Sequence, residues 1–494
     1  MNKGYKLIIL LLSVFALQSC SDLLEVQSPQ ALDSQKALTG KIGVNSAVIG
    51  LYDYLQSTRM YGRDQFAISE ALADNGRATN KSGRFNAEFQ NQPNSHMLNW
   101  QACYFLINQA NLVLNALPAV TDMTQAEKDV TAAQCFFLRA LAYFDLAKAY
   151  AYIPTYIVDA QNRGGVPIVL KGTIDQGTAL EGAKAPARAT IAETYQQIYT
   201  DLDSAIARYN ALASPNGLSK AFANRGAAQA LYSRVALYNG DWNRVVSFSG
   251  LAVASNLGRL STNGSYVTDW RQQVHPEAIF DLSFQQITES IGPNESLQTA
   301  YTTLATPGNR SITQGFGDLV PTASMLGALG VSLSGTTVTR TADVRGLLYE
   351  LGTTGRGTAE VECTKFIGKN GFPNQDNTPI FRVSEMLLNR AEAYFRLSRR
   401  DSAIIDLNVI RTRAGLAAVA DTSAAVVGNN LLEEILAQRR VELAFEGHRF
   451  FDLKRLGRTL AKTPAIPATD YRILAPIPAR EISSNPNLRQ NFGY

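Results

Sequence analysis

The sequence predicts a mainly α-helical protein, in which helix pairs stack as in tetratricopeptide repeats and loop-rich insertions carry little β-structure. Helical periodicity covers most of residues 41–255 and returns after residue 383, whereas residues 256–378 are rich in Gly, Thr and Ser. The hexapeptide RALAYF (139–144) recurs as RAEAYF (390–395), with a looser copy, SRVALY, at 233–238. Small residues between aromatics at helical spacing favour closely packed helix pairs. The copies are too far apart for one continuous solenoid, so long insertions must leave the stack.

Clear stop and start signals separate the helices predicted for the first half. Pro118 ends one helix and Gly240 separates two others. Thr190 and Glu193 have the spacing of a capping box at the start of a further helix. The segment 61–96 lacks periodicity and is predicted to be a loop. The expected helices are 41–57, 98–117, 127–150, one that begins after Thr190, 222–239 and 242–255.

The second half changes character before helices return. Strand-like pieces are expected at 278–284 and 363–367, among many turn signals. The Pro- and Asn-rich tail after residue 475 is predicted to be extended. Helical patterns cover 383–398, 401–413 and 429–453. We therefore expect an N-terminal helical region, 41–255, and a C-terminal region, 256–494, that form one compact unit.

The first twenty residues resemble the signal of a bacterial lipoprotein. Two lysines precede an apolar run at 7–16 that is too short to span a membrane. Residues 17–20 (LQSC) resemble a lipobox, with glutamine a less usual residue at its second position. We expect residues 1–19 to be removed and Cys20 to carry acyl chains that anchor the protein, followed by a polar tether up to residue 40. Plain secretion, with Cys20 left as a free thiol, is the alternative.

The overall composition is that of an ordinary globular protein, with 46% hydrophobic and 18% charged residues. The formal net charge of +4 falls to about +2 once the two signal lysines are removed, which argues against nucleic acid as a main partner. Cys103, Cys135 and Cys363 allow at most one internal disulfide. With only three scattered histidines, nothing in the sequence indicates a metal site or another cofactor.

A charged stretch near the C-terminus is compatible with either catalysis or structure. On a continuous helix over 429–453, Arg439 and Glu446 lie on the apolar face, with Glu442 and Arg449 at its edge. Charges on such a face are costly unless they are paired. Paired carboxylates can hydrolyse glycosides, but they must flank the scissile bond, whereas two on one helical face reach it from one side. We interpret these four residues as structural ion pairs and predict no catalytic residue.

Polar and aromatic side chains on the predicted loops indicate ligand binding. Sugars present apolar faces that stack on aromatic rings, and hydroxyls that pair with amides, carboxylates and guanidinium groups. For each aromatic candidate, simple packing beneath its own loop is the alternative. The candidates are Asp74, Asn75, Arg77, Asn80, Arg84, Phe85, Phe89, Trp270, Arg271, Tyr301 and Phe316.

Short motifs spread along the whole chain resemble, in the same order, those of SusD/RagB-type outer-membrane nutrient-binding lipoproteins. Each motif alone is weak, and the shared order makes the resemblance specific. The motifs are SDLL (21–24), FLRA (137–140), GVPI (165–168), LYNGDW (237–242), DVR (343–345), RVSE (382–385), AEAY (391–394), NVIRTRAGL (408–416), RVELAFEGHR (440–449), DLKR (452–455), PIP (476–478) and NPNLRQNFGY (485–494).

This resemblance implies four tetratricopeptide-like helix pairs, and a lipid anchor in the outer membrane with the protein facing outward. It also implies a binding protein without catalytic activity, which captures an oligosaccharide, or in some relatives a peptide. The ligand would pass to a SusC-type TonB-dependent transporter, over which the lipoprotein sits as a lid.

Ligand-contacting residues lie outside the shared motifs, so only two zones carry over from the resemblance. They are the loop after the first helix and the segment before Phe316-Gly317-Asp318. In the second zone, 285–314, Tyr301 is the only aromatic residue, which keeps peptides and other nutrients open as ligands. A glycoside hydrolase that uses Glu442 and Glu446 and a purely structural lid are the remaining alternatives.

Overall fold

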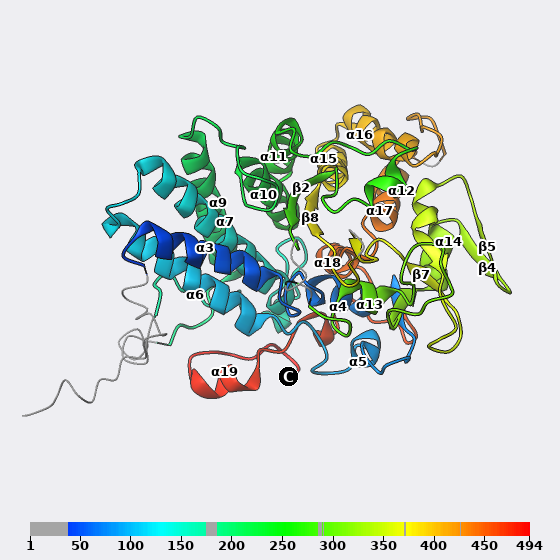
Figure 1. Ribbon diagram of the computed structural model, residues 1–494, viewed down its shortest axis with the longest axis horizontal. Helices are drawn as coiled ribbons and strands as arrows, with labels where there is room; N and C mark the ends of the chain where they lie inside the picture. The colour runs from blue at the N-terminus through cyan, green and yellow to red at the C-terminus, as the bar shows by residue number, and fades with distance from the viewer. Residues whose placement is uncertain (1–37, 174–184, 285–288, 290, 370–371, 425) are drawn as a thin grey trace, which may run out of the picture.

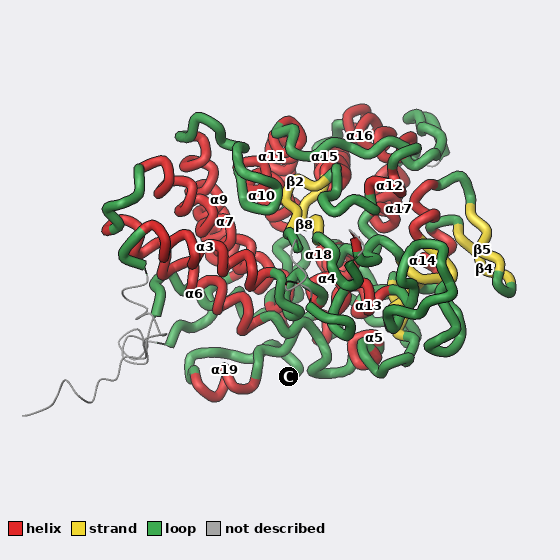
Figure 2. The backbone as a smooth tube through the Cα atoms, viewed as in Figure 1, coloured by secondary structure: helices red, strands yellow, loops and turns green. Residues whose placement is uncertain are grey.

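Helices dominate one side of the molecule, while loops with short strands dominate the other (Figures 1 and 2). This computed structural model describes residues 38–173, 185–284, 289, 291–369, 372–424 and 426–494. The predicted signal peptide, Cys20 and all but the end of the tether lie outside these residues. The predicted helix-pair scaffold is confirmed, because α6 packs on α7, α7 on α9, α10 on α11 and α15 on α16. The long helices are α3 (Lys41–Leu55), α6 (Trp100–Ala116), α7 (Gln125–Tyr150), α9 (Ile191–Asn210), α10 (Arg225–Asn239), α11 (Trp242–Ala254), α15 (Val383–Arg396), α16 (Arg400–Arg413) and α17 (Asn430–Glu442).

The predicted boundary signals act as expected. Thr190 and Glu193 form a reciprocal capping box at the start of α9, and Gly240 ends α10 with a φ of 74°. Within the described part of the chain, α7 alone is long and apolar enough to cross a membrane. Since 89% of its most apolar window is buried inside the fold, α7 is a core helix.

The repeated hexapeptides place equivalent contacts between paired helices. Arg139 of α7 donates two hydrogen bonds to the carboxylate of Asp201 in α9, at 2.9 and 2.5 Å. Arg390 of α15 makes the same two-pronged contact with Asp406 in α16, at 2.7 Å for both bonds. In the third copy, a serine of α10 at this position lies 2.6 Å, oxygen to oxygen, from a serine of α11. The first residue of each hexapeptide therefore makes a polar contact that aligns its helix with the partner helix.

Among the described residues, the loop-rich side contains short elements and four two-stranded antiparallel sheets. The pairs β1–β3 and β2–β8 join segments that are distant in sequence, whereas β4–β5 and β6–β7 are local. The strands are β1 (Gly76–Ala78), β2 (Ala278–Leu282), β3 (Leu319–Pro321), β4 (Val331–Ser334), β5 (Thr337–Arg340), β6 (Tyr349–Leu351), β7 (Val361–Cys363) and β8 (Thr378–Arg382). The short helices are α4 (Asp64–Leu72), α5 (Asn86–Phe89), α12 (Tyr266–Asp269), α13 (Leu297–Tyr301), α14 (Ala323–Ala328), α18 (Arg449–Arg455) and α19 (Ala479–Ser484).

The prediction that residues 61–96 form a loop is right only in part, because the short β1 and α5 and the longer α4 all lie within this range. Helix α4 lies there, and all nine of its residues are buried. A helix that is buried on every side has no polar face, so the amphipathic pattern that reveals most helices is missing. The predicted extended tail is also interrupted, by the short helix α19.

The predicted continuous helix over 429–453 is two helices. Helix α17 ends at Glu442 and α18 begins at Arg449. Between them, Phe445 and Gly447 adopt φ values of 64° and 78°. A Cβ atom on Gly447 would lie 2.6 Å from the Gln65 carbonyl oxygen, so only glycine allows the turn to approach α4 this closely. Glu442 and Glu446 therefore do not share a helical face.

Candidate functional site

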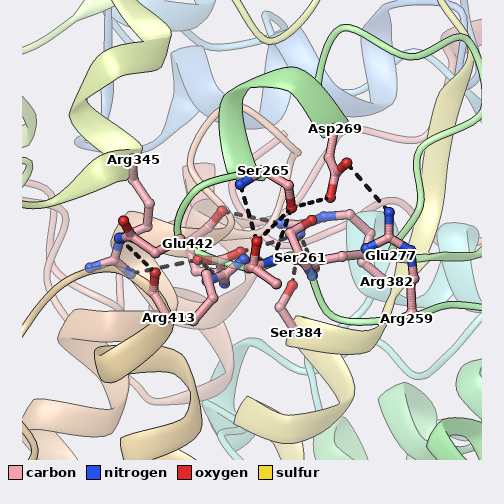
Figure 3. A network of polar contacts seen from close by, with 12 residues as sticks. Arg259, Ser261, Ser265, Asp269, Glu277, Arg345, Arg382, Ser384, Arg413 and Glu442 are labelled. Carbon is pink, nitrogen blue, oxygen red and sulfur yellow. Dashed lines mark hydrogen bonds and ion pairs between the residues drawn. The ribbon is translucent and has the colours of Figure 1, made fainter.

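A dense group of buried charges lies at the end of α17, where Figure 3 shows Glu442 among Arg345, Arg382 and Arg413. Arg382, at the end of β8, contacts Glu277 at 2.7 Å, Glu442 at 3.2 Å and Glu446 at 2.8 Å. Arg413 of α16 bridges Glu277 and Glu442, at 2.7 Å from each. Lys365 contacts Glu446 at 2.6 Å, and Arg345 lies 3.6 Å from Glu442. We call this set the buried network: Glu277, Arg345, Lys365, Arg382, Arg413, Glu442 and Glu446.

The carboxylates of the buried network are held by cations and are shielded from solvent. Glu442 is 0% exposed and Glu446 is 3% exposed. Burial opposes ionisation of Glu442, but three arginines, Arg413 foremost, hold its pKa below the usual range. A substrate would have to displace these ion pairs to reach either oxygen. The arrangement locks α16, α17 and β8 together.

The other two residues of the charged stretch are also ion-paired. Arg439 donates to Asp452 of α18 at 2.8 Å and to Asn389 of α15 at 2.6 Å. Arg449 donates two hydrogen bonds to Asp74, at 2.7 and 2.9 Å. Burial opposes ionisation of Asp74, but the bonds from Arg449 lower its pKa overall. Asp74, a predicted ligand-binding residue, is therefore a buried partner of α18.

Several other predicted ligand-binding residues lie inside the fold. Asn75, Trp270 and Tyr301 are fully buried, and Phe85 is 6% exposed. Asn75 donates to Glu70 and accepts from Arg440, while the Trp270 ring packs near Lys365 and Arg382. Arg271 is half-buried and donates to Thr364 and Glu350. These side chains pack beneath the loops, and of the five only Arg271 is partly exposed to solvent.

The structure brings together four of the predicted residues at one end of the β1–β3 ribbon. Arg84 lies over the half-buried ring of Phe316, with its guanidinium carbon 4.7 Å from the ring centre. Arg356 lies at 4.1 Å from the same centre. Arg77, at the start of this segment, pairs with Glu360 at 2.6 Å, and Asn80 is exposed in the following loop. We call this set the Phe316 surface: Arg77, Asn80, Arg84, Phe316 and Arg356.

Local backbone contacts hold the Phe316 surface in place. Ala78 of β1 pairs with Leu319 of β3, and the hydroxyl of Thr79 donates to the Gly317 carbonyl at 2.8 Å. Gly317 has a φ of 58°, and a Cβ atom there would lie 2.7 Å from a carboxylate oxygen of Glu362. The glycine thus permits a sharp turn directly over a buried carboxylate, and this turn presents Phe316.

A cavity of about 600 Å³ lies at the opposite end of the same ribbon. Phe89, the remaining predicted residue, lines it together with Asn91 and Lys462. Burial lowers the pKa of Lys462 to about 7. Its ammonium group donates to the carbonyls of Ala71 and Phe89 and to the Asn91 side chain, at 2.6–2.7 Å. Lys462 therefore holds the loop that contains Phe89 and Asn91, which forms one wall of the cavity, against the end of α4.

Sequence reasoning missed Arg356, Glu360 and Lys462. Arg356 lies in the Gly355-Arg356-Gly357 turn between β6 and β7, and no nearby pattern connects this turn to residues 77–84. Phe316 reaches the same surface because β1 pairs with β3. This pairing is a long-range contact, and the sequence of so short a strand does not predict its partner.

Among the described residues, the cysteines form no disulfide, and the acidic groups form no metal-binding cluster. Cys103, Cys135 and Cys363 are free and buried. Burial raises the pKa of the Cys135 thiol to about 12 and that of Cys363 to about 11. Where the structure describes the chain, no cluster of three or more His, Cys, Asp or Glu side chains could hold a metal ion.

Two families match this chain. Residues 360–467 match the SusD family, and residues 22–237 match a family described as starch-binding and associating with the outer membrane. The chain is 25% identical to "SusD-like protein P38" of Formosa agariphila, over 98% of each chain. It is 34% identical to "Starch-binding protein SusD" of Bacteroides thetaiotaomicron, over 25% of this chain and 22% of the relative.

Solved structures agree with these matches over nearly the full length. A putative sugar-binding protein from Bacteroides vulgatus superposes with a TM-score of 0.76 at 25% identity, covering 92% of this chain and 98% of that one. A SusD superfamily protein from Bacteroides thetaiotaomicron gives 0.75 at 25% identity, covering 91% and 98%. The helix-pair scaffold and the matches at residues 22–237 and 360–467 make this chain a SusD-like protein, similar over nearly its whole length to SusD superfamily proteins.

Proposed function

We propose that this protein is a non-enzymatic binder that captures an oligosaccharide at the cell surface through the Phe316 surface. The observation that supports this is the half-buried Phe316 ring, which lies between the guanidinium groups of Arg84 and Arg356. An aromatic ring offers a platform for the apolar face of a sugar, and arginine and asparagine offer hydrogen bonds to its hydroxyls. The cavity lined by Phe89 lies at the other end of the same β1–β3 ribbon and has room for a further sugar unit.

Calorimetric titration against a panel of plant, host and microbial oligosaccharides tests this proposal. Phe316→Ala should weaken binding of the active glycan at least tenfold, because it removes the stacking platform. Phe492→Ala is a matched control, since Phe492 is an exposed ring with Arg163 over it, in the C-terminal tail. Equal losses in the two variants, or binding of peptides with silence across all glycans, would contradict the proposal.

The proposal includes an anchor and a transporter. Acylated Cys20 would hold the protein at the outer membrane, facing outward, and a SusC-type TonB-dependent transporter would receive the ligand. Cys20→Ala should release the protein from the membrane fraction, and retention there would refute lipidation. Co-purification with the transporter, without any ligand binding by the isolated protein, would favour the alternative of a purely structural lid.

A hydrolase that uses Glu442 and Glu446 is disfavoured by their burial and ion pairing. Catalytic carboxylates must reach both sides of a glycosidic bond, and neither oxygen pair is open to a substrate. Incubation of the purified protein with each glycan that it binds should release no product. Product release that is lost in Glu442→Gln would restore the enzymatic alternative.

A further inference from the structure

The charges around the Phe316 surface do not balance. Among the described residues, four ion pairs at and around this surface, together with two unpaired arginines at the β6–β7 turn, make a set of six cations and four carboxylates, with a difference of +2. Four of the cations each have a carboxylate partner. The pairs are Arg77–Glu360 at 2.6 Å, Lys81–Glu362 at 3.4 Å, Arg84–Asp318 at 2.7 Å and Arg271–Glu350 at 3.3 Å. The two cations left over are Arg310 and Arg356.

Both unpaired arginines are exposed, and Arg356 lies within the turn that connects β6 to β7. Arg310 is tied to this turn by one hydrogen bond, from its Nε to the Gly352 carbonyl at 3.0 Å. Arg356 lies over Phe316 and donates no hydrogen bond to any part of the chain that the structure describes. The N–H donors of Arg356, which lies over the ring, and most of those of Arg310, which lies at Gly352, are therefore without a partner in the described chain.

A guanidinium group beside a sugar platform discriminates between ligands by charge. Its planar fork matches the two oxygens of a carboxylate or sulfate group. Hydrogen bonds to a charged acceptor are about twice as strong as those to a neutral hydroxyl. A neutral glycan would leave the excess charge of +2 uncompensated, whereas an acidic glycan would compensate it.

We propose that the ligand is an anionic oligosaccharide, whose carboxylate or sulfate groups pair with Arg356 and Arg310 while a sugar ring packs on Phe316. This inference rests on the proposed glycan-binding function and adds the chemical class of the glycan. It assigns different roles to neighbouring side chains. Phe316 supplies affinity for any sugar ring, and the two arginines supply the preference for negative charge.

Calorimetry with two pairs of probes tests this inference. Oligogalacturonides are compared with the same oligosaccharides after methyl esterification, and chondroitin sulfate oligosaccharides with desulfated chondroitin. The first pair differs in the carboxylate charge and the second pair differs in the sulfate groups. The two pairs therefore identify which of these anions the protein prefers. In at least one pair the charged form should bind at least tenfold more tightly at 50 mM NaCl. Raising NaCl to 300 mM should weaken binding of the charged form severalfold, because exposed charges are screened.

Variants assign the preference to named residues. Arg356→Gln and Arg310→Gln should each reduce the ratio of the two affinities severalfold, because each weakens binding of the more highly charged form much more than binding of its partner probe. Arg480→Gln is the matched control, because Arg480 is an exposed arginine of α19 without a carboxylate partner in the described chain. Figure 1 places α19 well away from β7, so this control should retain the full preference.

Three outcomes would overturn the inference. Equal or tighter binding of both the methyl-esterified and the desulfated probe would show that the excess charge does not select the ligand. A preference that survives in Arg356→Gln combined with Arg310→Gln would assign it elsewhere. Tight binding of an acidic peptide, such as oligoglutamate, with no binding of charged glycans would point to a peptide ligand. Binding of neutral glycans alone would contradict only this inference, whereas silence toward every glycan would contradict the proposed function as well.

Discussion

The buried network and the Phe316 surface are both made largely of arginines and carboxylates, yet their arginines are satisfied differently. In the buried network, Arg382 contacts three carboxylates and Arg413 contacts two. On the Phe316 surface, Arg84 has one carboxylate partner and Arg356 has none among the described residues. Saturated arginines can only hold the protein together, whereas unsaturated arginines beside an aromatic ring have capacity for a ligand. The two regions thus separate a structural use of arginine from a binding use.

The largest expected effect comes from opening the buried network. Glu446→Ala leaves Arg382 and Lys365 without a carboxylate that they share at 2.6–2.9 Å. Removal of one partner from a buried ion pair leaves an uncompensated charge and costs about 3–5 kcal/mol. We expect a loss of this size in the free energy of unfolding, measured by urea denaturation.

Glu433→Ala in α17 is the control for this experiment. Glu433 pairs with Arg458 at 2.5 Å, but its side chain is 56% exposed. Exposed ion pairs contribute about 0–1 kcal/mol, so this variant should have nearly the stability of the wild type. Similar losses in both variants would show that burial does not distinguish the network. Normal stability of Glu446→Ala combined with lost glycan affinity would assign Glu446 to the binding site instead.

The sequence predicts the scaffold because periodic apolar faces and the repeated hexapeptides report local helix packing. It does not reveal α4, because a helix buried on every side has no polar face. It also hides the break between α17 and α18, because Leu443, Phe450 and Leu453 continue the helical period across the turn. Gly447 was the one local signal of that break.

The candidate site could be predicted only in part, for a related reason. Arg84 and Phe316 were found because loops that carry aromatic and basic residues favour ligand binding. Trp270 and Tyr301 have the same composition signal, yet they pack beneath those loops and are 0% exposed. Residue type alone does not separate these cases, since exposure depends on long-range pairings such as β1 with β3.

A smaller effect is expected from Glu70, which lies between the two regions. It accepts hydrogen bonds from the Asn75 side chain at 3.1 Å and from the Gly447 backbone at 3.1 Å. Burial raises the pKa of Glu70 to about 7, against about 4.5 for an exposed glutamate. Between these values the unfolded chain ionises while the folded protein keeps the proton. The contribution of Glu70 to stability should therefore fall as the pH rises from about 4.5 to 7.

Glu70→Gln tests this linkage, because glutamine is neutral at every pH. The free energy of unfolding of the wild type should decline more steeply between pH 5 and pH 8 than that of the variant. The difference should be of the order of 1–3 kcal/mol. Parallel pH profiles for the two proteins would contradict the raised pKa of Glu70. They would indicate that Glu70 is ionised in the folded protein, as the ion-paired carboxylates are.

The smallest expected effect on stability is that of Arg77→Gln, compared with the same substitution in an ion pair of the interior. Arg77 pairs with Glu360, and these side chains are 36% and 26% exposed. Arg439 pairs with Asp452 in the interior, where they are 1% and 7% exposed. Arg77→Gln should change the free energy of unfolding by less than about 1 kcal/mol, whereas Arg439→Gln should cost several kcal/mol.

This last pair of variants should also differ in ligand binding. Arg77→Gln removes a polar group from the Phe316 surface and should weaken glycan binding severalfold at unchanged stability. Arg439→Gln should leave the affinity of the folded fraction unchanged, when calorimetry is performed below its unfolding temperature. If Arg77→Gln instead destabilised the protein as much as Arg439→Gln, then the Phe316 surface would be an extension of the structural network. Its free guanidinium groups would then have to be explained by packing, since a surface that the fold needs for its own stability has less capacity left for a ligand.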